Sequence, residues 1–203
     1  MIGVIDYGMG NLYSVSKALE RMNAEYVVSS DLSMLQKAKA YILPGVGAFK
    51  DAMAILTESK IADFLKEEVG KGKPLLGICL GMQLLFNESE ENGWTEGLGF
   101  LNGQVKRIPG EELKVPHMGW NKLTFHRDHP LLSGLKEDYV YFVHSYYAVT
   151  NDEDIVIASS EYGVTVPAVV GNQHVFGCQF HPEKSGKLGL AILRNYLTFV
   201  AGM

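Results

Sequence analysis

In the first half of the chain, short runs of apolar residues alternate with longer segments in which apolar residues recur every three or four positions. The short runs, which predict β-strands, are residues 2–6, 24–30, 38–45 and 74–78. The longer segments, which predict α-helices, are residues 12–23, 48–59, 61–72 and 80–91. Because strands that alternate with helices usually pair in parallel, this half predicts an open, mostly parallel sheet with helices on its faces.

The pattern changes after residue 93, where strand-like runs follow one another with only turns between them. These runs are residues 98–108, 121–125, 139–149, 154–160, 165–170 and 172–180, and an apolar helix over 187–200 closes the chain. Successive strands joined by turns favour antiparallel pairing. We find no linker, repeat or low-complexity tract. The sequence therefore predicts a single α/β domain over residues 1–203, with antiparallel strands added in its second half.

Composition narrows the class of protein. A length of 203 residues with 47% hydrophobic residues suits one domain that has its own core. The net charge of −5 gives no broad basic surface for nucleic acid or an anionic membrane, and no apolar run approaches the ~20 residues of a membrane span. The N-terminal segment has no secretory pattern, and the two cysteines are expected to be free thiols. We therefore expect a cytoplasmic protein.

The stretch "GICLGMQ", residues 77–83, places Cys79 between two glycines where a predicted strand meets a predicted helix. A cysteine on such a corner is presented at the carboxyl edge of the sheet, and the nearby helix N-terminus favours its thiolate. The backbone N–H of Leu80 points the same way and can bind a developing oxyanion. A cysteine that simply fills a gap in the core is the alternative, and the motif alone leaves both open.

The stretch "FGCQFHPEKS" supplies a base and a group to orient it. A predicted strand ends at His181, and Glu183 lies two residues further on, so the two side chains can project to the same side of an extended segment. A strand-end histidine beside a solvated glutamate is the alternative. Because a thiol nucleophile needs a base within reach, we predict a catalytic triad of Cys79, His181 and Glu183. Cys178 is better interpreted as a buried strand residue.

The remaining motifs are less specific. His126, His129 and His174 lie in polar turns without metal-ligand spacing, so no metal site is predicted.

In "LPGVGAF", residues 43–49, Gly45 and Gly47 free the backbone to turn N–H groups toward a ligand, although an ordinary strand–turn–helix connection explains them equally well. No Gly-Lys-Ser/Thr follows, so this is not a phosphate-binding loop.

Taken in order, "PGVGAF", "GICLGMQLLF" and "FHPEKS" resemble the motifs of the class I, triad-type glutamine amidotransferases. Three further stretches narrow the resemblance. "DYGMGNL" (residues 6–12), "PHMGWN" (116–121) and "YFVHSY" (141–146) are similar to the glutaminase subunits of imidazole glycerol phosphate synthase, an enzyme of histidine biosynthesis. The resemblance runs from the first predicted strand to the final helix and implies the fold of this family.

The resemblance implies hydrolysis of glutamine to glutamate and ammonia through a cysteinyl thioester. It implies that the N–H groups of Val46 and Leu80 stabilise the oxyanion. His181 would protonate the leaving ammonia and then activate water, while Glu183 steadies the imidazolium. The residues implied to hold glutamine are Gly45, Gly47, Gln83, Ser145 and Tyr146. No cofactor is implied.

The resemblance also implies a partner, a separate (β/α)8-barrel cyclase subunit in a 1:1 heterodimer. This subunit would use the ammonia to make imidazole glycerol phosphate and aminoimidazole carboxamide ribonucleotide. The residues implied to face it are His117, Met118, Trp120, Asn121, Tyr141 and Lys184. Trp120 would be an anchor, because tryptophan is typical of interface hot spots, although a core aromatic is the alternative.

The stretch "PGVG" is a candidate switch. A backbone flip at Val46 is harder than one at glycine because valine has a Cβ, and docking of the cyclase would favour the state in which this N–H faces inward.

Rival functions remain at this point. Another triad glutaminase, of the vitamin B6, anthranilate synthase or GMP synthetase type, would use the same chemistry with a different partner. A cysteine protease or γ-glutamyl hydrolase would use the same nucleophile on another substrate. A non-catalytic binding protein would have no need of an oriented base, so the His-Pro-Glu segment argues against it.

Overall fold

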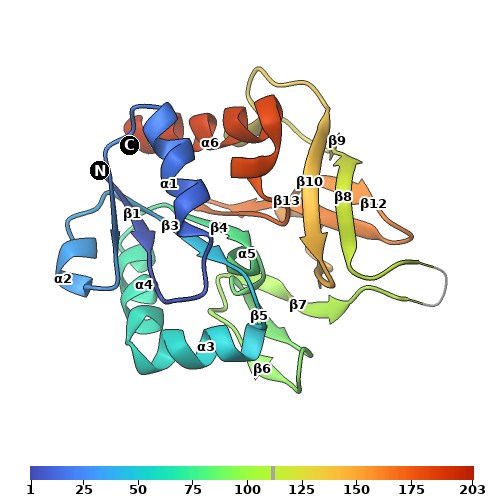
Figure 1. The fold of residues 1–203 in the computed structure, drawn as a ribbon, viewed down its shortest axis with the longest axis horizontal. Helices are drawn as coiled ribbons and strands as arrows, with labels where there is room; N and C mark the ends of the chain where they lie inside the picture. The colour runs from blue at the N-terminus through green and yellow to red at the C-terminus, as the bar shows by residue number, and fades with distance from the viewer. Residues whose placement is uncertain (111–112) are drawn as a thin grey trace.

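The computed structural model describes residues 1–110 and 113–203 and is built around one large sheet (Figure 1). This sheet has eight strands in the order β2-β1-β3-β4-β14-β13-β12-β9. Their bounds are β1 (Ile2–Ile5), β2 (Tyr26–Ser29), β3 (Ala40–Gly45), β4 (Leu75–Cys79), β9 (Thr124–Phe125), β12 (Val156–Glu161), β13 (Thr165–Asn172) and β14 (Val175–Cys178). The strands from β2 to β14 pair in parallel, and β13, β12 and β9 extend the sheet in antiparallel pairs. The predicted fold class is confirmed.

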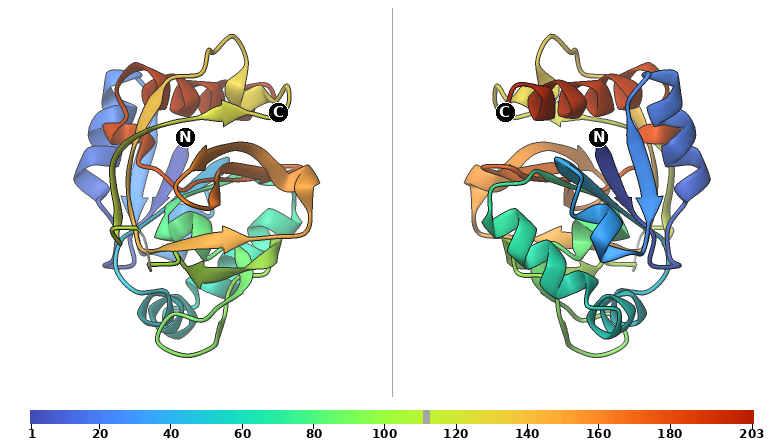
Figure 2. Two further views of the ribbon diagram at one scale, coloured as in Figure 1. Left: turned by 90° about the vertical axis from the view of Figure 1, so that its right-hand side faces the viewer. Right: turned by 90° about the vertical axis from the view of Figure 1, so that its left-hand side faces the viewer.

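Helices cover both faces of this sheet (Figure 2). On one face, α1 (Leu12–Arg21) and α6 (Gly186–Ala201) share one hydrophobic cluster with the strands. On the other face, a second cluster holds residues of α3 (Phe49–Glu58) and α4 (Ile61–Gly70), together with the short helices α2 (Leu32–Leu35) and α5 (Leu80–Gln83). Within residues 1–110 and 113–203, no helix is both long and apolar enough to cross a membrane.

The spacing of apolar residues explains why the helices lie on the sheet. In α6, Leu188, Ile192 and Tyr196 recur every fourth position, and all three side chains are buried. This recurrence puts them on one face of the helix, which therefore packs against the strands. At the start of α1, the side chain of Asn11 accepts a hydrogen bond from the backbone N–H of Ser14 and so caps the helix.

Within the described residues, two smaller sheets and three 3-10 helices complete the fold. A four-stranded sheet has the order β11-β7-β5-β6, and β10 pairs with β8 in an antiparallel ribbon. The strands are β5 (Phe86–Ser89), β6 (Thr95–Glu96), β7 (Leu101–Arg107), β8 (His117–Lys122), β10 (Tyr139–His144) and β11 (Tyr146–Val149). The 3-10 helices are η1 (Pro130–Leu132), η2 (Glu153–Ile155) and η3 (Pro182–Lys184).

Three predictions about these elements are wrong. The single strand expected over residues 121–125 is divided at Leu123, because β8 ends at Lys122 and pairs with β10, while β9 belongs to the large sheet. The helix expected over residues 80–91 ends at Gln83, and residues 86–89 form β5, because their backbone pairs with β7 and Asn87 and Ser89 are weak helix formers. The single strand expected over residues 139–149 is divided at Ser145. Its two parts, β10 and β11, belong to different sheets.

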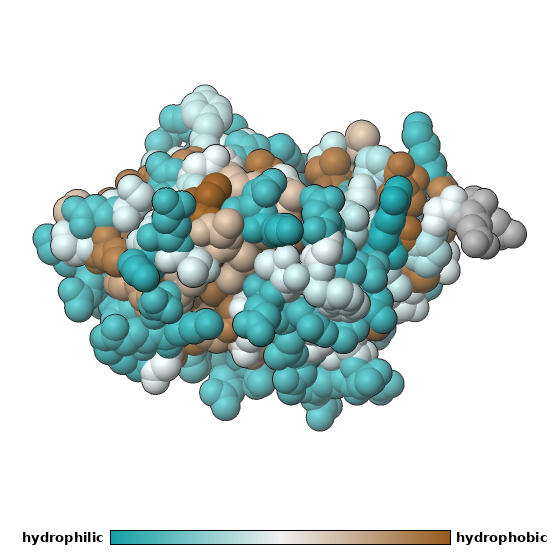
Figure 3. All heavy atoms as spheres, turned by 90° about the horizontal axis from the view of Figure 1, so that it is seen from below, coloured by the Kyte–Doolittle hydropathy of each residue, from teal (hydrophilic) through white to brown (hydrophobic). Residues whose placement is uncertain are grey.

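The surface is mixed in character. Seen from below in Figure 3, it is mainly hydrophilic, with small hydrophobic areas between polar side chains. Scattered hydrophobic residues of this kind are normal on protein surfaces. Exposed large side chains gather on the β8–β10 ribbon, where Met118 is 61%, Trp120 57% and Tyr139 55% exposed.

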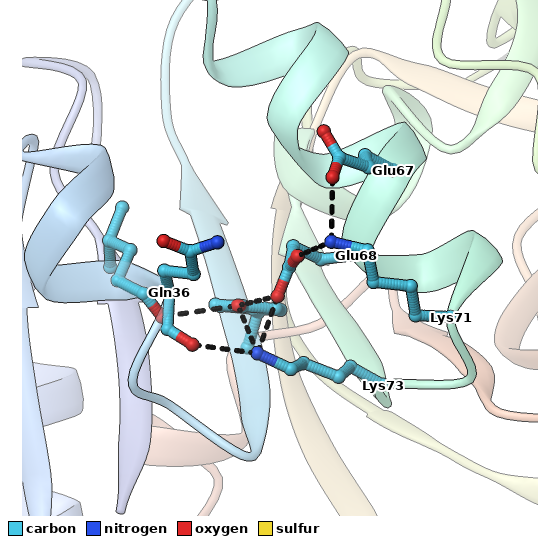
Figure 4. A network of polar contacts seen from close by, with 7 residues as sticks. Gln36, Glu67, Glu68, Lys71 and Lys73 are labelled. Carbon is cyan, nitrogen blue, oxygen red and sulfur yellow. Dashed lines mark hydrogen bonds and ion pairs between the residues drawn. The ribbon is translucent and has the colours of Figure 1, made fainter.

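The buried carboxylate of Glu68 links the C-terminal end of α4 to β3 and α2 through hydrogen bonds (Figure 4). The side chain of Glu68 is 3% exposed and accepts hydrogen bonds from Lys71, Lys73 and the hydroxyl of Tyr41. Lys73 also donates to the carbonyl of Gln36, 2.8 Å away. Burial raises the pKa of Glu68, but the hydrogen bonds from these two lysines and from Tyr41 outweigh burial and lower it to about 2. The ionised carboxylate is therefore the form that stabilises the fold.

Replacing this carboxylate should weaken the fold in a pH-dependent way. Glu68→Gln is expected to lower the free energy of unfolding by about 1–3 kcal/mol at pH 7, because charge-assisted hydrogen bonds at a buried site are lost. The pKa of Glu68 falls from its usual 4.5 to about 2 on folding, so its contribution is complete above pH 4.5 and is lost as the pH falls toward 2. Urea unfolding of both proteins at pH 7 and pH 3 should give a smaller difference at pH 3.

The matched control is Glu67→Gln, which removes a carboxylate that also binds Lys71 but is 67% exposed. It should change the free energy of unfolding by no more than about 0.5 kcal/mol. Equal effects of the two substitutions, or a Glu68→Gln effect that does not change with pH, would contradict this assignment.

Candidate active site

Cys79 occupies the predicted strand-to-helix corner, as the last residue of β4 and the N-cap of α5. Its backbone has φ 56° and ψ −111°, a region that residues with a side chain rarely adopt. Such strain persists only where the surrounding structure imposes it. Gly81 is part of that surrounding structure, because a Cβ at this position would lie 1.8 Å from the carbonyl oxygen of Leu43 in β3.

His181 and Glu183 lie together, in the segment that follows β14. The Nδ1 atom of His181 is 2.9 Å from Oε1 of Glu183, and both side chains are almost completely buried. Burial lowers the pKa of His181, but hydrogen bonding to Cys79 and to Glu183 raises it to about 9. An imidazolium is therefore favoured at neutral pH beside the Cys79 sulfur, which is the arrangement that a cysteine nucleophile and its base require.

A cavity of about 240 Å³ opens beside Cys79 and His181. It is lined by Val46, Gly47, Cys79, Leu80, Gln83, Glu91, Val143, His144, Ser145, Tyr146 and His181. The residues expected to hold glutamine are thus brought to one cavity, with the exception of Gly45. Gly45 lies behind the lining, where a Cβ would be 2.8 Å from the backbone nitrogen of Gly81. Within the described residues, no three His, Cys, Asp or Glu side chains are placed to hold a metal ion.

Two glutamines connect the cavity wall to the cysteine. Nε2 of Gln83 donates to the carbonyl of Tyr146 at 2.9 Å and to Oε1 of Gln179 at 3.2 Å. Nε2 of Gln179 in turn lies 3.9 Å from Sγ of Cys79, and the Gln179 side chain is completely buried. Sequence reasoning missed Gln179. An amide between the apolar residues Cys178 and Phe180, directly before the His-Pro-Glu segment, was the signal that could have identified it.

Sequence reasoning also missed Glu91, because the segment that holds it was interpreted as part of a helix. Glu91 lines the cavity, and its Oε2 accepts a hydrogen bond from the backbone N–H of Phe49 at the start of α3, 2.8 Å away. Burial raises its pKa, and the nearby charge of Asp51 raises it further, while the bond from Phe49 acts in the opposite direction. This carboxylate gives the cavity a group that can bind a cation.

The N–H of Val46, one of the two expected oxyanion donors, is occupied elsewhere. It donates to the carbonyl of Met9, in the loop between β1 and α1, at 2.7 Å. For this N–H to face the cavity, the peptide that joins Gly45 to Val46 has to rotate. The Leu80 N–H, by contrast, belongs to the corner itself and lies at the start of α5.

The residues expected at a partner interface fall into two groups. Met118 and Trp120 are exposed on β8, the ring of Trp120 lies 6.2 Å from that of Tyr141 on β10, and Lys184 is exposed in η3. His117, however, is 2% exposed and has its ring stacked against Phe142 and Tyr162. A side chain buried in this way does not itself present a surface to a partner.

His117 instead connects the β8–β10 ribbon to the cavity wall. Nδ1 of His144 donates to the carbonyl of Tyr146 at 2.8 Å, so its Nε2 accepts from Nδ1 of His117 at 2.9 Å. Asn121 Nδ2 lies 3.3 Å from the remaining ring nitrogen of His117. Burial lowers the pKa of each histidine to about 4, so both are neutral near pH 7 and the direction of this chain of hydrogen bonds is fixed.

Comparison with known proteins agrees with this geometry. The family model described as "Glutamine amidotransferase class-I" matches residues 3–198. The chain is 64% identical to "Imidazole glycerol phosphate synthase subunit HisH" of Geobacillus thermodenitrificans, covering 100% of this chain and 97% of the relative. It is 56% identical to the protein of the same name from Bacillus subtilis, covering 99% of this chain and 97% of the relative.

Solved structures share the fold. A structure described as "Crystal structure of glutamine amidotransferase" superposes with a TM-score of 0.79 at 24% identity, covering 100% of this chain and 99% of that one. "Structure of PurLQS from Thermotoga maritima" superposes with a TM-score of 0.76 at 23% identity, covering 98% of each chain. With the family model and the relatives that match over their whole length, these comparisons lead to one conclusion: the chain belongs to the HisH family of class I glutamine amidotransferases.

Proposed function

We propose that residues 1–203 act as one glutamine amidotransferase domain that hydrolyses glutamine to glutamate and ammonia. The observation that carries this proposal is the arrangement of Cys79, His181 and Glu183 beside a cavity of about 240 Å³. The cavity has the groups that a free amino acid needs. The carboxylate of Glu91 would bind the α-ammonium group, and the backbone of Gly47, Ser145 and Tyr146, with Gln83, would hold the rest of the substrate.

In the proposed reaction, the Cys79 thiolate attacks the side-chain amide carbon of glutamine and forms a carbon–sulfur bond. The negative charge that develops on the amide oxygen is stabilised by the Leu80 N–H and, after rotation of its peptide, by the Val46 N–H. The His181 imidazolium gives its proton to the leaving ammonia. It then takes a proton from the water that hydrolyses the thioester, while Glu183 keeps the ring in place.

The ammonia released at Cys79 would need a destination other than water, where protonation removes its nucleophilicity. The relatives named above are subunits of imidazole glycerol phosphate synthase. We therefore propose a (β/α)8-barrel cyclase subunit as the partner in a 1:1 heterodimer, which uses the ammonia in histidine biosynthesis in the cytoplasm. The relatives do not favour the vitamin B6, anthranilate or GMP synthetase alternatives.

The β8–β10 ribbon is the proposed docking surface. Met118 and Trp120 lie two residues apart and so project to the same side of β8, and Tyr139 pairs with Lys122 two residues further along. Together they form an exposed apolar stripe, to which Tyr141 and Lys184 add polar groups, whereas Asn121 projects to the other side of β8 and contacts His117 there. Buried aromatic anchors in a polar rim are typical of interfaces. His117 would support this surface from behind and connect it to the cavity.

The two cysteines offer a matched test of the nucleophile. Cys79→Ala should reduce glutamate release from glutamine by more than about 1,000-fold in the presence of the cyclase subunit, because no thioester can form. Cys178→Ala removes a thiol that is buried in β14 and is not among the residues that line the cavity, and should keep activity within a few fold of the unchanged protein. Comparable activity of the two variants would remove Cys79 from its proposed role.

The role of Glu91 predicts a specific kinetic signature. Glu91→Gln keeps an acceptor for the Phe49 N–H but loses the charge that would bind the α-ammonium group, so KM for glutamine should rise about 10- to 100-fold. The value of kcat should change much less, since Glu91 is not assigned to the reacting amide. The matched control is Glu90→Gln, whose carboxylate accepts from the backbone N–H of Arg107 and does not line the cavity. A KM unchanged in Glu91→Gln would contradict this placement of the substrate.

A further inference from the structure

The hydroxyl of Tyr7 is a buried donor that the reaction described above does not use. Tyr7 follows β1, and its side chain is 6% exposed among the hydrophobic residues on the α3 face of the sheet. Within residues 1–110 and 113–203 its hydroxyl has no hydrogen-bond partner. A buried polar group without a partner is unfavourable, so a second arrangement in which it gains one would be stabilised relative to the first.

This hydroxyl lies beside the peptide that has to rotate. It is 2.7 Å from the position that a Cβ at Gly45 would occupy, and the same position is 2.9 Å from Cβ of Leu80. The hydroxyl is therefore next to the backbone of Gly45 and the start of α5, behind both oxyanion donors. Burial, together with the charge of Cys79, raises the pKa of Tyr7, so the group remains a proton donor throughout the working pH range.

Rotation of the Gly45–Val46 peptide would reorient an acceptor, the Gly45 carbonyl, in the neighbourhood of this hydroxyl. At present the Val46 N–H points to the carbonyl of Met9, 2.7 Å away. The N–H and the carbonyl of a peptide point in opposite directions, so turning this N–H toward the cavity turns the Gly45 carbonyl toward Met9. The carbonyl oxygens of Gly45 and Met9 would then face each other without a hydrogen-bond donor between them. A carbonyl moved into buried surroundings needs a donor. The Tyr7 hydroxyl, which lies beside Gly45, can donate this hydrogen bond.

We propose that Tyr7 is a positioning residue for the oxyanion hole, whose hydroxyl donates to the Gly45 carbonyl once the Val46 N–H faces the cavity. This inference rests on the proposed glutaminase function. Tyr7 is outside the cavity lining, so it acts through the peptide and does not touch the substrate. It stabilises the competent state alone, since it has no hydrogen bond to lose in the state described here.

The test is Tyr7→Phe, assayed for glutamate release from glutamine in complex with the cyclase subunit. We expect kcat to fall by about 10-fold or more and KM for glutamine to change less than about 2-fold, because an oxyanion donor acts in the transition state. The melting temperature should stay equal or rise, because the substitution removes an unpaired buried hydroxyl. The control is Tyr13→Phe, the same change at a side chain that is 74% exposed, which should alter neither kcat nor stability.

A second reaction distinguishes an effect of Tyr7→Phe on the oxyanion hole from an effect on the reactivity of the Cys79 thiol. Alkylation of Cys79 by iodoacetamide forms a carbon–sulfur bond and expels iodide without an oxyanion, so its rate in Tyr7→Phe should match that of the unchanged protein. An unchanged kcat, or a parallel loss in alkylation and glutamate release, would overturn the role of Tyr7. If the unsubstituted chain in complex with the cyclase released no glutamate, the proposed glutaminase function would be wrong. That result is distinguishable from a failure of the role proposed for Tyr7, in which the unsubstituted complex is active.

Discussion

The site depends on the direct contact between the backbone of α5 and the strands beneath it. A Cβ at Gly81 would lie 1.8 Å from the Leu43 carbonyl oxygen, and a Cβ at Gly77 would lie 2.5 Å from the Gly81 carbonyl oxygen. No side chain fits between these surfaces, so the helix lies against the sheet with little freedom to shift. This contact holds Cys79, the proposed nucleophile, in its unusual backbone conformation. It also fixes the direction of the Leu80 N–H, the first proposed oxyanion donor.

Topology then brings His181, the proposed base, to Cys79. β4 and β14 are neighbours in the sheet and run in the same direction, with Ile78 paired to Cys178. The residues that follow each strand therefore meet at one edge, although about a hundred positions separate them in the sequence. The sequence alone pointed to Cys79, His181 and Glu183 as candidates, because each lies in a local motif whose geometry follows from the residues around it. It also predicted the alternation of strands and helices over residues 2–83, apart from the short helix α2.

What the sequence did not reveal depends on contacts between distant segments. The helix expected over residues 80–91 is cut short because β5 finds a partner in β7, and this pairing is also what places Glu91 in the cavity. Gln179 acquires its significance from Gln83 and Cys79, which lie on other elements. The burial of His117 follows from the pairing of β8 with β10 and from its stacking on Phe142 and Tyr162. No local pattern in a single sequence encodes these pairings.

The proposed nucleophile and base are in place in this structure, while one proposed oxyanion donor is turned away. The central proposal is that a partner has to turn the Val46 N–H from Met9 toward the cavity. The most direct measurement is the rate of glutamate release from glutamine by the chain alone and by the chain saturated with the cyclase subunit and its nucleotide substrate. We expect stimulation on the order of 100-fold or more, the usual contribution of one oxyanion donor. An equally fast reaction by the chain alone would contradict the claim, because the hydrogen bond between Val46 and Met9 would then be no barrier to catalysis.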